Sequence, residues 1–186
     1  GPGIGGIAFG NKVVNNLVCN SYRGYEFWSP RYANGEFSGN RASRVFNGFT
    51  PWETSADYIV KDLGVYSCNG AVHLGYPSKD LIFDGLVATA PTGIVEGTAA
   101  NGWYFGDYTA ERLRVRRGKF QNMQVFVPAK MQLPGLPDGT FGEFWLENFE
   151  FDGGGVVMYQ AEFDSGGASG RNWPALPVLI DVCKAL

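Results

Sequence analysis

The stretch YEFWSPRYANGEFSGNRASRVFNGFTPW, residues 25–52, decides the predicted fold. It contains two aromatic clusters, at residues 27–30 and 49–52, each with a proline, and they lie on either side of Asn34-Gly35. An Asn-Gly pair between aromatic runs is the strongest short-range hairpin signal, because both residues accept a positive φ. The sequence therefore predicts a β-hairpin that brings both aromatic clusters to one sheet surface.

Further strand candidates follow along the chain, separated by short turns. They cover residues 64–68, 71–74, 81–88, 102–108, 111–117, 120–127, 143–151 and 156–163. Asp152-Gly153-Gly154-Gly155 predicts a second hairpin turn. Strands at hairpin spacing indicate a single antiparallel meander that curves into a half-barrel or barrel.

Three segments complete the predicted fold class, which is mainly β with one or two short helices. Residues 4–20 fit a short amphipathic helix or a strand. Residues 55–63 fit either a helix or a strand, and residues 177–186 form a short helix or a final strand. We find no internal repeat and no low-complexity linker in the sequence.

Length and composition indicate one ordinary globular domain. The chain has 186 residues, a formal net charge of −3, 27 glycines and 15% aromatic residues. The Gly1-Pro2-Gly3 start is typical of a cleaved purification tag, so residues 4–186 are expected to be a single β domain. The acidic balance argues against nucleic-acid binding. No run of 18 apolar residues exists, which predicts no membrane span.

Cysteine usage and the lack of a signal sequence favour the cytoplasm. The three cysteines, Cys19, Cys68 and Cys183, are an odd number at wide spacing, which is a poor disulfide framework. The alternative is that two of them pair and one stays free. The sequence leaves the oligomeric state open, with a homodimer among the options.

Standard catalytic and metal-binding signatures are missing. His73 is the only histidine, which excludes a site with several histidines, and it lies inside a strand candidate. We interpret it as a structural or surface residue. No Cys-x-x-Cys motif occurs, so a structural zinc site is not expected.

An arginine stripe alternates along one strand candidate, at Arg112, Arg114 and Arg116, with Arg117 following. It could bind an anionic ligand. The interpretation we favour is a solvated strand face, in which acids such as Glu143, Glu147 and Glu150 pair with it across the sheet.

Two charged residues are candidates for chemistry. Glu26 lies among Tyr25, Phe27 and Trp28, where burial would favour its protonated form. By alternation it shares a face with Trp28, whereas Tyr25 and Phe27 share the other, and either face could be the ligand side. Arg171 stands beside Trp173 after a Gly/Ser-rich segment, where it either pairs with a substrate carboxylate or closes a loop.

Three short motifs resemble the family of VioE, the violacein-biosynthesis enzyme. They are Trp28-Ser29-Pro30, Gly48-Phe49-Thr50-Pro51-Trp52 and Arg171-Asn172-Trp173-Pro174. The resemblance implies a half-open antiparallel sheet like that of bacterial lipoprotein carriers, and an enzyme that works without cofactor or metal. It also implies that Phe49 and Thr50 line a pocket, that Tyr25 lies near it, and that Arg171 holds a substrate carboxylate.

Three functions follow as hypotheses. The first is a cofactor-independent enzyme that steers rearrangement, cyclisation or coupling of an apolar aromatic intermediate. Its catalytic residues would be Arg171 and Glu26. Its substrate-binding residues would be Tyr25, Trp28, Phe49, Thr50, Trp52 and Trp173. The second is a carrier for a hydrophobic ligand such as a lipid or pigment. The third is a carbohydrate-binding β module.

Overall fold

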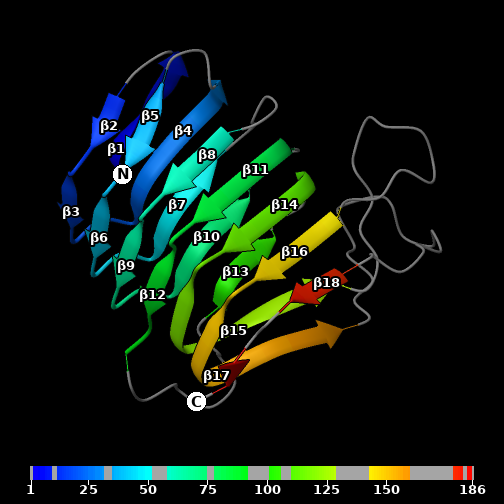
Figure 1. The fold of residues 1–186 in the computed structure, drawn as a ribbon. Helices are drawn as coiled ribbons and strands as arrows, with labels where there is room; N and C mark the ends of the chain where they lie inside the picture. Colours follow the sequence, from blue (N-terminus) through cyan, green and yellow to red (C-terminus); the bar gives the residue numbers. More distant parts are fainter. Residues whose placement is uncertain are drawn as a thin grey trace, which may run out of the picture.

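The computed structural model describes ten segments of the chain. They are residues 2–9, 12–31, 35–51, 58–74, 78–91, 101–105, 110–128, 143–159, 178–181 and 184–185. Across these segments the chain forms nineteen β-strands and no helix (Figure 1). Neighbouring strands in the sheets run parallel.

The strands form three faces. Face 1 contains β1 (Pro2–Phe9), β4 (Arg23–Arg31), β7 (Asn47–Pro51), β10 (Gly70–Leu74) and β13 (Asn101–Phe105). Face 2 contains β2 (Lys12–Val14), β5 (Glu36–Ser38), β8 (Tyr58–Lys61), β11 (Ser78–Asp84), β14 (Ala110–Arg116), β16 (Glu143–Glu147) and β18 (Val178–Asp181). Face 3 contains β3 (Leu17–Cys19), β6 (Arg41–Ser43), β9 (Gly64–Tyr66), β12 (Val87–Thr89), β15 (Lys119–Pro128), β17 (Glu150–Tyr159) and β19 (Lys184–Ala185).

The chain passes through faces 1, 2 and 3 in order, and each such set of strands, which we call a coil, stacks on the preceding coil. Face 2 is a seven-stranded sheet, whereas faces 1 and 3 belong to one twelve-stranded sheet, joined where β15 continues from face 3 into face 1. In Figure 1 the coils follow one another from the blue N-terminal strands to the orange and red C-terminal ones. This arrangement is a parallel β-solenoid.

The predicted antiparallel meander, with its half-barrel or barrel and its short helices, is therefore wrong. The strands on either side of Asn34-Gly35 do not pair with each other: β4 pairs in parallel with β1 and β7, and β5 pairs with β2 and β8. Both hydrogen-bonding edges of β4 and of β5 are occupied by strands of the preceding and following coils, so neither strand has a free edge for a hairpin partner. The second predicted hairpin turn, residues 152–155, lies within β17.

The segments read as helix or as long strands also divide differently. Residues 4–20 contain β1, β2 and β3, and residues 177–186 contain β18 and β19. The candidate strand 81–88 is split by a bend at Gly85, and the candidate strand 143–151 by a bend at Asn148. Each bend turns the chain from face 2 to face 3.

A residue with positive φ marks each of these bends. At the corner between faces 2 and 3 these residues are Asn15, Gly39, Asp62, Gly85, Arg117 and Asn148, with φ between 48° and 84°. Between faces 3 and 1 they are Asn20, Arg44, Ser67, Asn122 and Gly153, with φ between 53° and 71°. One residue in the left-handed region reverses the strand pleat and redirects the chain without a long loop.

The sequence contains a repeat, contrary to the expectation that it has no internal repeat. Tyr25 pairs with Phe49 and Phe27 with Pro51, each 24 positions later. Farther along, Phe83 pairs with Val115, 32 positions later, because longer connections enter the coils. The two aromatic clusters therefore occupy equivalent places in successive coils.

The core fills the inside of the solenoid with stacks of side chains that continue from coil to coil. Face 2 contributes two stacks, one of Phe37, Val60, Phe83, Val115 and Leu146 and one of Tyr58, Leu81 and Leu113, and face 3 contributes Val18, Ala42, Val65, Ala88, Phe120 and Phe151. Aromatic rings link the faces: the Phe37 centroid is 5.1 Å from that of Tyr25 and 5.1 Å from that of Phe49. Stacking buries apolar surface that strands of three residues could not bury alone.

Candidate functional site

The candidate site is the outer side of face 1, on β4, β7 and β10. Register places Arg23 beside Asn47 and Glu26 beside Thr50. Phe49 lies beside Val72, which places His73 beside Thr50. Glu26, Thr50 and His73 therefore form one line across β4, β7 and β10. Tyr25, Phe27, Phe49 and Val72 face the core, and alternation turns Glu26, Thr50 and His73 to the outside. Strict alternation would turn Arg23 and Asn47 toward the core with Tyr25 and Phe49, but their contacts to Glu26 and His73 put them with the outer residues. We call Arg23, Glu26, Asn47, Thr50 and His73 the polar row.

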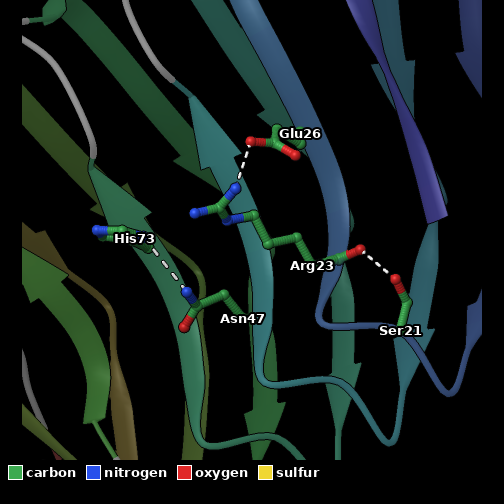
Figure 2. A network of polar contacts seen from close by, with 5 residues as sticks. All are labelled: Ser21, Arg23, Glu26, Asn47 and His73. Carbon is green, nitrogen blue, oxygen red and sulfur yellow. Dashed lines mark hydrogen bonds and ion pairs between the residues drawn. The ribbon is translucent and has the colours of Figure 1, made fainter. Parts of the chain in front are cut away.

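Direct contacts connect members of the polar row. Nη1 of Arg23 lies 2.6 Å from Oε1 of Glu26, and Nδ2 of Asn47 lies 3.3 Å from Nδ1 of His73 (Figure 2). The Ser21 hydroxyl donates a 2.7 Å hydrogen bond to the Arg23 carbonyl, which holds the entry into β4. Figure 2 shows the Arg23 side chain reaching across from its own strand, with its guanidinium below Glu26.

The polar row is shielded although it faces outward. Glu26 is 8% exposed, Asn47 5% and Thr50 0%. The Thr50 Oγ1 atom is buried and has no hydrogen-bond partner. A buried polar atom without a partner carries a desolvation cost and is uncommon in folded proteins.

The Asn47 contact sets the proton position on His73. With the amide nitrogen as the donor, Nδ1 of the ring accepts, and the proton of the neutral ring is on Nε2. In Figure 2 the second ring nitrogen points away from Asn47. The imidazole therefore presents an N–H group away from the strand that holds it.

An exposed aromatic pair lies at the corner that leads into face 1. The rings of Tyr22 and Phe46 stack with centroids 5.0 Å apart and planes 5° apart, although the residues are 54% and 45% exposed. Each precedes a member of the polar row, Arg23 or Asn47, and the Arg23 guanidinium lies 5.4 Å from the Tyr22 ring centroid. Backbone bonds from Phe46 N to Ser21 O and from Asn47 N to Tyr22 O fix this register.

The structure brings together only part of the predicted site. Glu26 and Thr50 both belong to the polar row. Tyr25 and Phe49 do not line a hollow: both are 0% exposed in the core, since alternation points them inward. Trp28 lies in β4, and nothing of its side chain is described. Trp52, Arg171 and Trp173 are outside the described residues.

The sequence analysis did not single out Arg23 or Asn47, and it interpreted His73 as a structural or surface residue. Neither Arg23 nor Asn47 belongs to a motif, so only the 24-residue repeat could have found them. When the sequence is aligned with itself at an offset of 24 residues, Arg23 falls opposite Asn47 and Glu26 opposite Thr50. Polar residues therefore recur at equivalent positions of successive coils.

Tyr25 anchors the site from the inside. Burial raises its pKa to about 12, which keeps the phenol neutral. Its hydroxyl lies 2.9 Å from the carbonyl oxygen of Asn16, in the preceding coil, and 2.9 Å from that of Arg41, in its own coil. Tyr25 therefore stabilises the strand that carries Glu26.

The arginine stripe lies on the outer side of face 2, away from the polar row. Register places Arg112 beside Glu143 and Arg116 beside Glu147, whereas Glu150 pairs with Lys119 on face 3. Arg116 and Arg117 both contact Asp84, at 3.1 Å and 2.5 Å.

Ion pairing governs the protonation of Asp84. Burial acts to raise its pKa, but the hydrogen bond from Arg117 and the charges of both arginines outweigh burial and hold the pKa below its usual value. The cluster is accounted for by these mutual contacts and needs no ligand.

No group of three or more His, Cys, Asp or Glu residues that could hold a metal ion occurs in the described part of the chain. Nor does any described segment form a helix long and apolar enough to cross a membrane.

Fold and site together define a parallel β-solenoid with a shielded polar row on one outer face. No family model, no curated protein and no solved structure matches the chain. The half-barrel that the VioE resemblance implies is not the fold observed, since the strands are parallel.

Proposed function

We propose that the outer side of face 1 binds carbohydrate, as a module for an extended, neutral polysaccharide. The observation that carries the proposal is the juxtaposition of the exposed Tyr22–Phe46 pair with the polar row. Sugars present apolar C–H faces that pack on aromatic rings and hydroxyls that pair with amide, guanidinium and carboxylate groups. The aromatic pair directly precedes β4 and β7, the strands that carry Arg23, Glu26, Asn47 and Thr50.

The geometry of the solenoid supports a linear polymer. Adjacent strands lie about 4.8 Å apart, so equivalent side chains recur at that interval along the stack. Solenoids offer extended binding surfaces for this reason. The ligand is proposed to be neutral because Arg23 already pairs with Glu26.

The other two hypotheses, an enzyme for an apolar aromatic intermediate and a carrier for a hydrophobic ligand, stay predictions. Both relied on aromatic side chains gathered around an open hollow. Of these aromatic side chains, Tyr25 and Phe49 are buried in the core. No observation on the described residues favours either hypothesis over carbohydrate binding.

A glycan array followed by calorimetric titration tests the proposal. The variant Tyr22→Ala should weaken the best array hit about tenfold, equivalent to about 1.4 kcal/mol. Tyr66→Ala is the matched control, because Tyr66 is an exposed tyrosine, 37% exposed, on face 3. The proposal is wrong if no neutral glycan binds, or if Tyr22→Ala binds like the wild type.

A further inference from the structure

We propose that the chain forms a two-fold dimer in which the first coils of two copies join edge to edge. The first coil consists of β1, β2 and β3, at the blue end of the stack in Figure 1. In the described part of the chain each of them pairs with one strand only, β4, β5 or β6 of the second coil. Their opposite edges present backbone N–H and C=O groups, which are templates for pairing with another chain. The inference does not depend on carbohydrate binding.

The first coil lacks the charges that usually protect an open edge. Residues 2–22 contain one charged side chain, Lys12, whereas residues 23–46, which form the second coil, contain six. Natural edge strands are commonly blocked by charged side chains, proline or bulges, and here the proline is Pro2, at the first position of β1. Leu17 on β3 is in addition 67% exposed. This composition is typical of an edge that another chain covers.

The arrangement of the three open edges points to a second copy as the partner. The edges lie on the three faces of one coil, so a single extended peptide could pair with only one of them. A partner that pairs with all three must itself present three strands around a coil of the same size, as the first coil of another copy does. Two copies that meet through the same surface are related by a two-fold axis, and this axis makes the joined strands antiparallel.

Strand length places the two-fold axis. An axis that relates two three-sided coils passes through one corner and the face opposite it, so one strand meets its own copy and the other two exchange. β1 has eight residues, whereas β2 and β3 have three each. Matched lengths therefore require β1 to pair with β1 of the second copy, and β2 with β3. The axis then passes through the corner at Asn15 and Asn16, between β2 and β3.

The backbone of this corner has the direction that such pairing needs. The N–H of Asn15 donates to the second coil, and the C=O of Asn16 accepts from it. Successive residues of a strand point their backbone groups to opposite edges. The residues of β2 and β3 that point theirs to the open edge are therefore Lys12, Val14, Leu17 and Cys19.

Side chains agree with the same register. Antiparallel pairing about the corner sets Val14 opposite Leu17 of the second copy, so the two most apolar edge positions cover each other. It also sets Val13 opposite Val18, and both of these side chains point to the core. The Val14 carbonyl already accepts from Nδ2 of Asn16 at 3.1 Å, and its second lone pair can accept from the partner strand.

Sedimentation equilibrium of the 186-residue chain over a dilution series tests the association. We expect a dimer of twice the 20.3 kDa chain mass. Leu17→Lys should raise the dissociation constant at least about tenfold, because a charge on the edge opposes pairing. Tyr66→Lys is the matched control, since Tyr66 is an exposed apolar residue on β9, both of whose edges are paired. It should dimerise like the wild type, and both variants should keep the circular dichroism of the folded chain.

An engineered disulfide tests the position of the axis. The register sets Lys12 opposite Cys19 of the second copy, at a Cα separation that a disulfide can span. Lys12→Cys should therefore give a dimer band on a non-reducing gel after mild oxidation, and the double variant Lys12→Cys, Cys19→Ser should not.

Four results would overturn the proposal. They are a monomer at every concentration, an assembly that keeps growing beyond the dimer, a Leu17→Lys variant that dimerises like the wild type, and a dimer that forms without the disulfide of Lys12→Cys.

Discussion

Replacing Asn40 by alanine tests whether the corner between faces 2 and 3 depends on side-chain hydrogen bonds. Asn40 is 0% exposed. Its Oδ1 accepts from the backbone N and from Nδ2 of Asn16, both at 3.0 Å, and its Nδ2 donates to the Val13 carbonyl at 2.6 Å. In the next two coils the equivalent position is apolar, Leu63 and then Leu86. The first two coils are thus joined at this corner by amides instead of by apolar packing.

The expected loss follows from the three hydrogen bonds. At roughly 1 kcal/mol each, Asn40→Ala should reduce the free energy of unfolding by about 3 kcal/mol. For a chain of this size that change lowers the melting temperature by roughly 6–12 °C. Leucine at position 40 should cost less than alanine, because its burial offsets part of the loss.

Urea denaturation followed by tryptophan fluorescence measures the change, and a double-mutant cycle with Asn16→Ala isolates the side-chain pair. We expect a coupling energy of about 1 kcal/mol, since one of the three bonds joins the two amides. A loss below about 1 kcal/mol for Asn40→Ala, together with zero coupling, would refute the reasoning. It would mean that backbone pairing alone sets this corner.

Three further predictions concern packing, charge and thiol reactivity. Gly48→Ala should destabilise the fold by about 1–3 kcal/mol in the same assay, because a Cβ there would lie 2.6 Å from both Cγ atoms of Val65 and from a backbone oxygen. Asp84→Asn should lower the free energy of unfolding above about pH 4, because the lowered pKa of Asp84 means that the folded state favours the carboxylate. Below that pH, the variant should lose less stability on further acidification than the wild type. An unchanged loss of stability at acid pH would contradict this. With Cys183 replaced by serine, one thiol, Cys19, should react with iodoacetamide at pH 8, whereas Cys68, whose pKa burial raises to about 12, should react only on unfolding, as mass spectrometry would show.

The sequence alone was sufficient for the local properties. Alternation along residues 25–28 placed Tyr25 and Phe27 together on one side and Glu26 on the other, and the structure confirms this division. The arginine stripe was likewise interpreted as a solvated strand face, because charged residues that alternate along a strand usually mark its solvated side, and register places acids one strand away from it. These properties depend on the period of a strand, which is written in the chain.

The direction of strand pairing could not be read from the same local signals. Asn34-Gly35 is a hairpin signal whether or not the flanking strands meet. Here the partners of β4 are β1 and β7, about one coil away in each direction. Unequal connections hide the period in the later coils, where the spacing grows from 24 to 32 residues.

What the sequence determined by itself is which side chains point inward and which outward, because each strand imposes that alternation locally. What only the tertiary structure decided is which residues become neighbours. Glu26, Thr50 and His73 are far apart along the chain and meet in one line, since successive coils stack in register through backbone hydrogen bonds. The aromatic residues that seemed to form a ligand pocket became core for the same reason: the coils close around them.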